Sequence, residues 1–130
     1  MLKLILMILL VVASGSAMAE WVSIFKSVDG YFYANSASIQ RNDNIVSMWI
    51  MADYKNPKMI KLGSMYKSTK EHDEYDCNEG RTRKLASELY VENMGFGPLL
   101  RRDTSIDQWT PVTPGSITEL MWKYACGKMQ

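Results

Sequence analysis

Two cysteines, Cys77 and Cys126, are the side chains of this sequence best suited to a defined chemical role. Both follow an apolar, leader-like N-terminal segment, and an even number of cysteines in an exported chain favours a disulfide. Such a bridge closes a loop of about 50 residues, worth roughly 4 kcal/mol in the chain-entropy model. The alternative is a free or metal-bound pair, although one histidine and two distant cysteines do not match a zinc-site pattern.

An acidic run surrounds the only histidine, His72. His72 and Asp73 suggest an acid–base pair, but neighbouring strand residues point to opposite faces, so we expect a solvated histidine instead. The run also lacks the central glycine and closing glutamate of an EF-hand calcium loop. No Gly-x-Ser-x-Gly motif surrounds a serine. We therefore predict a protein that is not an enzyme and has no metal or cofactor; catalysis by the carboxylates of residues 71–76 is the alternative.

The N-terminal segment has the organisation of a cleavable signal peptide. Lys3 precedes an apolar run over residues 4–13, and Ala17-Met18-Ala19 supplies the small residues of a cleavage site. A membrane anchor is the alternative, but a spanning helix needs about 20 apolar residues. We expect removal of residues 1–19, leaving residues 20–130 as one domain with no transmembrane segment. Because no cysteine lies at the cleavage site, we expect a periplasmic, secreted or cell-surface protein, not a lipoprotein.

The charge balance of the processed chain argues against a nucleic-acid partner. Removal of Lys3 leaves 14 Lys and Arg residues against 14 Asp and Glu residues. Nucleic-acid binding draws most of its affinity from neutralised phosphates, which requires an excess of cations. Aromatic residues are frequent instead, and we expect most of them in the core. Any exposed Tyr or Trp would suit a protein interface.

Strand patterns dominate the chain from residue 21 to residue 103. Asp29-Gly30 lies between two aromatic-rich runs, which predicts a hairpin with a type I′ turn. Residues 45–54 carry apolar side chains on both parities, which predicts a central strand, and Asn56-Pro57 should end it. Further strands are expected over residues 63–77, 81–91 and 99–103, with extended chain from Thr110 to Pro114.

The predicted hairpin over residues 71–84 has complementary charges on its two strands. Folding at Asn78-Glu79-Gly80 places carboxylates opposite cations, and each cross-strand pair contributes roughly 0.2–1 kcal/mol. We expect this pairing rather than metal binding. The residues concerned are Glu71, Asp73, Glu74 and Asp76 on one strand, and Arg81, Arg83 and Lys84 on the other.

The C-terminal segment carries the one clear helix pattern. Ser116 and Glu119 form a capping box, apolar residues follow at helical spacing, and Gly127 suits the position after the helix. A bridge between Cys77 and Cys126 would attach the end of this helix to the sheet. The fold class predicted is therefore α+β, mainly β: an antiparallel sheet of about six strands with one C-terminal helix packed on a face and tethered by a disulfide.

A series of short motifs runs in order along nearly the whole processed chain. These are Trp21-Val22, Tyr31-Phe32-Tyr33 with Asn35, Ser38-Ile39, Val46-Ser47-Met48-Trp49, Tyr75-Asp76-Cys77, Arg81, Tyr90 to Gly97, Trp109-Thr110-Pro111-Val112, and Pro114-Gly115-Ser116 running to Cys126. Together they resemble the surface-adhesin protein E family of proteobacteria. The resemblance implies an antiparallel sheet with a C-terminal helix held to one face by a disulfide between Cys77 and Cys126.

The resemblance implies adhesion through a protein partner, either a host matrix protein or another envelope protein. It assigns no ligand-binding residue in this chain. The alternative function is that of a periplasmic structural or assembly factor that binds another envelope protein. A second copy of the chain is a further candidate partner, because an exposed sheet edge can pair with another strand.

Overall fold

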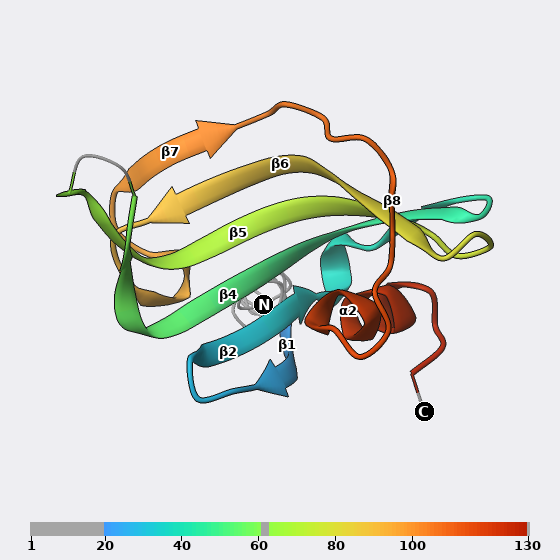
Figure 1. Cartoon of the computed structure of the whole chain (residues 1–130), viewed down its shortest axis with the longest axis horizontal. Coiled ribbons are helices and arrows are strands. Elements are labelled where there is room, and N and C mark those ends of the chain that lie inside the picture. Colours follow the sequence, from blue (N-terminus) through green and yellow to red (C-terminus); the bar gives the residue numbers. More distant parts are fainter. Residues whose placement is uncertain (1–19, 61–62, 130) are drawn as a thin grey trace, which may run out of the picture.

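The computed structural model describes residues 20–60 and 63–129, which form an antiparallel sheet and a C-terminal helix (Figure 1). The predicted signal peptide, residues 1–19, lies outside the described residues. Within the described ranges, no helix has the length and apolar character that membrane crossing requires. The elements are β1 (Trp21–Lys26), β2 (Gly30–Asn35), η2 (Ser36–Ser38), β3 (Gln40–Asn42), β4 (Ile45–Met59), β5 (Met65–Asp76), β6 (Arg81–Tyr90), η4 (Asn93–Gly95), β7 (Leu99–Asp103), β8 (Thr110–Pro111) and α2 (Ile117–Ala125).

The sheet is antiparallel at every strand pair described. Its main path runs β1-β2-β4-β5-β6-β7, while β3 pairs with one end of β4 and β8 pairs with β6. The six strands of this path and the one α-helix of the described residues confirm the predicted mainly-β fold class, to which the two short strands are additions. Strand β4 is central, as its apolar pattern predicted, and β1 and β7 lie at the two ends of the path.

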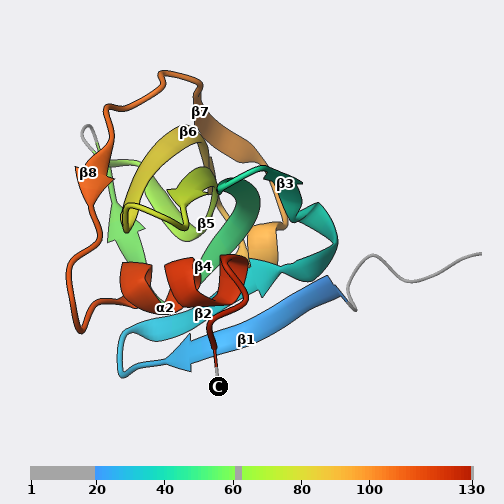
Figure 2. The same cartoon turned by 90° about the vertical axis from the view of Figure 1, so that its right-hand side faces the viewer.

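The core lies between the sheet and α2, which packs beside β1, β2 and β4 at one end of the sheet (Figures 1 and 2). We call the face that carries α2 the helix face. Its strands contribute fully buried Val46, Met48 and Tyr75, and α2 contributes Met121. On the opposite face Met51 is also fully buried. Met59 and Met65, which pair near the tip of the β4–β5 hairpin, are exposed.

Helix α2 begins and ends as its sequence predicts. The hydroxyl of Ser116 accepts a hydrogen bond from the backbone N–H of Glu119, at 3.1 Å. The Glu119 carboxylate accepts in turn from the backbone N–H of Gly115, at 3.3 Å, so the box closes one residue earlier than expected. Gly127 has a φ of +68°, the left-handed conformation that commonly ends a helix.

Three contacts attach the C-terminal end of α2 to the end of β5. Cys77 and Cys126 form a disulfide across a sequence separation of 49, as predicted. The indole N–H of Trp122 donates to the carbonyl oxygen of Asp76 at 2.9 Å, and the Lys128 ammonium donates to the carbonyl oxygen of Cys77 at 2.9 Å. The disulfide and the two hydrogen bonds therefore all attach to Asp76 and Cys77, at the end of β5.

Two turn predictions were wrong. Gly30 is not at positive φ and belongs to β2, so the first hairpin does not have a type I′ Asp29-Gly30 turn. The hydroxyl of Ser27 instead accepts from the backbone N–H groups of Asp29 and Gly30. Gly30 is needed for a different reason, since a Cβ there would collide with the carbonyl oxygen of Asp53.

Pro57 does not end β4, contrary to the prediction. The strand continues to Met59, and its register with β5 shifts between Asp53 and Lys58. Proline cannot donate a ladder hydrogen bond, but an irregularity in the pairing removes that requirement. The hairpin is therefore longer than expected.

Removal of the disulfide should destabilise the domain strongly. The double substitution Cys77→Ser and Cys126→Ser should lower the free energy of unfolding by about 4 kcal/mol, because the unfolded chain regains the entropy of a long loop. Urea unfolding followed by far-UV circular dichroism measures this change. Wild-type protein in reductant should approach the double variant, and equal stability of all three forms would contradict the assigned role. Intact mass without reduction should be lower than the reduced mass by two hydrogens.

Candidate functional site

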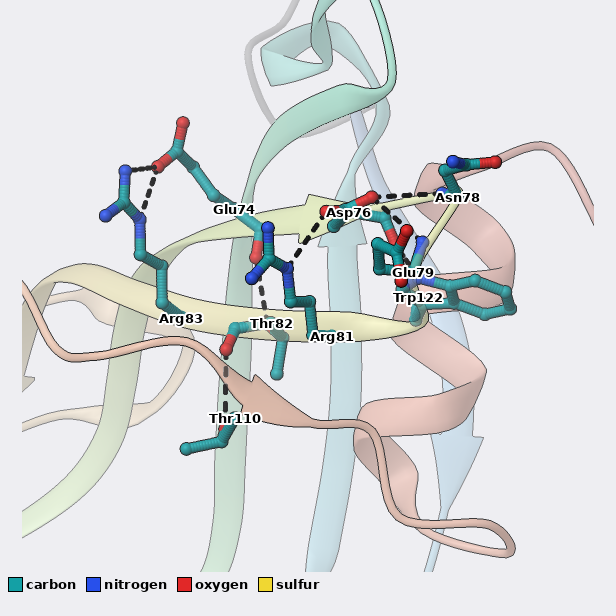
Figure 3. A network of polar contacts seen from close by, with 9 residues as sticks. All are labelled: Glu74, Asp76, Asn78, Glu79, Arg81, Thr82, Arg83, Thr110 and Trp122. Atoms are coloured by element: carbon teal, nitrogen blue, oxygen red, sulfur yellow. Dashed lines mark hydrogen bonds and ion pairs between the residues drawn. The ribbon is translucent and has the colours of Figure 1, made fainter.

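The acidic run of β5 is divided between the two faces of the sheet. Glu74 and Asp76 form ion pairs with the next strand, at 2.8 Å to Arg83 and 3.0 Å to Arg81 (Figure 3). The cross-strand pairing expected for these residues is therefore present. Backbone N–H groups, first that of Glu79, also hold the pKa of the Asp76 carboxyl below its usual value. These two carboxylates fix the turn and the register.

The other two carboxylates, Glu71 and Asp73, line a cavity on the helix face. The cavity measures about 460 Å³ and lies between β5, β6, the segment after β7 and the first turn of α2. We call Glu71 and Asp73 the acidic pair. The lining residues are Glu71, Asp73, Thr82, Arg83, Lys84, Asp107, Gln108, Thr110 and Thr118.

Asp73 is the most unusual side chain of this cavity. It is only 6% exposed, and the Tyr75 hydroxyl donates to its Oδ2 at 3.4 Å. Within residues 20–60 and 63–129, its Oδ1 has no hydrogen-bond partner. Burial, and secondly the charge of Glu71, raises the pKa of Asp73 to about 9. Asp73 therefore keeps a proton at neutral pH and can share it with Glu71.

The expected ion pair between Asp73 and Lys84 does not form, although the two residues are register partners. The Lys84 ammonium lies instead 3.9 Å from Oδ2 of Asp107, in the segment that leads to β8. The register shift lies on the other side of Asp73, between Asp73 and His72, so it does not separate the two residues. The charge of Lys84 still acts to lower the pKa of Asp73, but among the described residues the acidic pair forms no ion pair.

The segment over residues 104–112 forms one wall of the cavity and is fastened to β6. Its backbone donates from Asp107 to the carbonyl oxygen of Lys84, at 2.9 Å. The indole ring of Trp109 contacts two guanidinium groups, and its centroid lies 4.8 Å from Cζ of Arg81 and 4.6 Å from Cζ of Arg83. Cation–π contacts of this kind each contribute about 0.5–1 kcal/mol at exposed sites. These contacts fix the segment over residues 104–112 against β6.

A second, more apolar cavity of about 240 Å³ adjoins the first. The two share Glu71 and Thr118 as lining residues, so they form one continuous surface in front of the N-terminal turn of α2. We call this surface the helix-side groove and its apolar part the apolar wall. The apolar wall consists of Phe32, Ile50, Tyr54, Ile117 and Met121.

The groove stays open because α2 is short. Nine helical residues span about 13 Å, whereas the fifteen residues of β4 span about 50 Å when extended. The helix therefore covers only one end of the helix face (Figure 1). The uncovered part is where Tyr54 and the acidic pair lie.

The opposite face brings together different predicted residues. His72 stacks on Trp49, with ring centroids 4.8 Å apart, and burial lowers the pKa of His72. His72 is thus a half-buried packing residue on the face away from Asp73, and the two form no acid–base pair. Lys70 lies over the rings of Trp21 and Tyr90, at 5.8 and 5.2 Å.

The expectation that most aromatic residues lie in the core was only partly right: Tyr75 is fully buried, and Phe32, Trp122 and Tyr124 pack against the core. Every Tyr and Trp of the described residues is buried or half-buried, and only Phe25 and Phe96 are exposed. Within the same residues, no group of three His, Cys, Asp or Glu side chains is arranged to hold a metal ion. The groove residues Phe32, Tyr54 and Asp107 were not recognised from the sequence, because strand pairing and the path of the chain after β7 bring them near β5.

Stability should fall as pH rises toward the pKa of Asp73. An unfolded aspartate titrates near 3.8 and the folded one near 9, so the folded chain holds an extra proton between these values. The resulting stabilisation is complete below pH 3.8 and is lost as pH rises through about 9. Asp73→Asn, which cannot titrate, should flatten the pH dependence of the unfolding free energy between pH 5 and pH 9. The exposed variant Glu79→Gln should keep the wild-type slope; identical slopes in wild type and Asp73→Asn would contradict the assignment.

Solved structures of protein E share this fold. Crystal form II of Haemophilus influenzae protein E superposes with a TM-score of 0.68 at 15% identity, covering 84% of this chain and 88% of that chain. A second Haemophilus influenzae protein E structure gives 0.65 at 15% identity, with 84% and 85% covered. Protein E from non-typeable Haemophilus influenzae gives 0.60 at 16% identity, with 84% and 76% covered. At such identities the likeness concerns the fold.

Family membership rests on the sequence itself. No protein with a curated description matches this sequence. A family model described as surface-adhesin protein E, however, matches residues 21–127. The match includes both cysteines, all the strands and the helix described above. The chain therefore belongs to the surface-adhesin protein E family.

Proposed function

We propose that this chain is an exported, non-enzymatic binding protein that mediates protein–protein adhesion at the cell envelope. The observation that carries the proposal is the adhesin family match over residues 21–127, joined to an open groove on the helix face. We further propose that residues 1–19 are a cleaved signal peptide and that residues 20–130 form the exported domain. The disulfide supports export, because such bonds persist in oxidising compartments.

The arrangement of the carboxylates supports binding rather than catalysis. Glu74 and Asp76 are held by arginines, and Asp73 keeps its proton up to a high pH. His72, which has the side chain best suited to proton transfer near neutral pH, lies on the other face. These groups do not converge on one point, as a general acid and base acting on one substrate must.

The helix-side groove is the proposed contact surface of the partner. It combines an aromatic side chain, Tyr54, with polar and charged groups, which is the composition typical of energetically important interface residues. The outer edges of β1 and β7 have no partner strand among the described residues and offer strand addition as a second mode of contact. The partner proposed is a matrix or envelope protein.

A binding assay with purified partners tests this function. The processed, disulfide-bonded protein should bind at least one purified matrix glycoprotein or isolated envelope protein with micromolar or stronger affinity, measured by biolayer interferometry. Absence of binding across both panels would reject adhesion. Recovery of the protein from the cell surface or medium supports adhesion to host proteins, whereas strict periplasmic retention would favour the assembly-factor alternative.

A matched pair of tyrosine variants locates the contact surface. Tyr54→Ala should weaken partner binding at least tenfold, because it removes an aromatic group from the helix-side groove. Tyr33→Ala removes the same group from the neighbouring strand β2 on the opposite face, where Tyr33 pairs with Met51, and should change affinity less than threefold. Both variants are first checked for wild-type circular dichroism. The reverse pattern would place the interface on the opposite face.

A further inference from the structure

The hydrogen bonding of the acidic pair is incomplete, and no cation is paired with it among the described residues. Within the described residues, Glu71 forms no ion pair, and Oδ1 of the 94% buried Asp73 accepts no hydrogen bond. The nearby cations are engaged elsewhere, Lys84 with Asp107 and Arg83 with Glu74. Buried charged or polar groups left without partners are unfavourable, so a donor arriving from outside would be stabilised here.

The shape of the groove specifies the kind of donor. The apolar wall leads directly to the acidic pair, since Glu71 and Thr118 belong to both cavities. A long side chain with an aliphatic stem and a cationic end fits the apolar wall followed by the acidic pair. Such a side chain buries its stem against apolar surface and places its charge against a polar group. An ammonium group carries three donors and no acceptor, which suits two adjacent carboxyl groups.

We propose that the helix-side groove binds a lysine side chain presented by the protein partner, with its ammonium group between Glu71 and Asp73. The aliphatic stem of that lysine lies along the apolar wall, beside Phe32 and Tyr54. This inference rests on the proposed function, since it names the chemistry by which the partner is recognised.

Lysine binding is coupled to a proton. The groups that face Asp73 are Glu71 and Tyr75 from β5 and Lys84 from β6, with Asp107 across the cavity. Without ligand, Asp73 is protonated at neutral pH. Arrival of an ammonium group favours the carboxylate form of Asp73, so the proton leaves to solvent as the ion pair forms. Charge balances: one cation enters the groove and one proton departs.

A peptide titration of the processed, disulfide-bonded protein tests the inference. The probe is the capped tripeptide Gly-Lys-Gly, and the control is the same peptide with norleucine in place of lysine. The lysine peptide should shift the ¹⁵N–¹H signals of Glu71, Asp73 and Thr118, whereas the norleucine peptide should bind at least tenfold more weakly. Equal binding of the two peptides, or tighter binding of an arginine peptide, would overturn the proposal.

Two isosteric variants and a control give a second readout. Glu71→Gln and Asp73→Asn should each weaken binding of the lysine peptide at least tenfold, while Glu79→Gln, outside the cavity, should leave it unchanged. Calorimetry of wild type in two buffers of different ionisation enthalpy should show proton release at pH 7 that is absent in Asp73→Asn. Loss of binding in Glu79→Gln as well, or no proton release in wild type, would contradict the assignment. If a protein partner binds but the lysine peptide does not, this inference fails and the adhesion function stands.

Discussion

The cross-link between Cys77 and Cys126 determines where the C-terminal helix can lie. A nine-residue helix is marginal in water on its own, because nucleation is unfavourable and few turns offset it. Here its last turn is joined to the end of β5 by sulfur, by the indole of Trp122 and by the ammonium of Lys128. Strand pairing sets the register of the sheet, and the disulfide sets the position of the helix on the sheet.

Because the helix is fixed at one end of the sheet, the helix-side groove stays open. The same strand, β5, presents Asp76 to the turn and the acidic pair to the uncovered part of the helix face. Side chains alternate between the two faces along a strand. Glu74 and Asp76 therefore form ion pairs with β6, while Glu71 and Asp73 line the cavity on the helix face. The segment over residues 104–112, held by the contacts of Trp109 with two arginines, completes the lining of the cavity.

The fold was largely predictable because its signals are local. Apolar runs, the Ser116 cap, Gly127 and the opposite charges around the β5–β6 turn each act within a few residues of one another. The wrong predictions concern residues whose conformation depends on backbone that is distant in the sequence. Gly30 is needed by its neighbour strand rather than by a turn, and Pro57 is tolerated because the β4–β5 register shifts nearby.

The groove could not be predicted in the same way. Glu71 and Asp73 were recognised as acidic, but Asp107 and Phe32 reach them only through strand pairing and the path of the chain after β7. Lys84 does lie opposite Asp73 in the register, but its ammonium group pairs with Asp107 of the segment after β7. A sequence pattern does not reveal such a contact, because it depends on how segments distant in the sequence pack together.

The placement of methionine has a consequence for chemical durability. Met48, Met51 and Met121 are at most 1% exposed, whereas Met59 and Met65 at the hairpin tip are 69% and 42% exposed. Oxidation of a methionine thioether to a sulfoxide makes an apolar side chain polar. The rate of this oxidation increases with the solvent exposure of the sulfur atom. Peroxide should therefore react first at Met59, and next at Met65 and Met129, which are 42% and 41% exposed. The exposed methionines should be oxidised first, while the buried Met48, Met51 and Met121 remain thioethers.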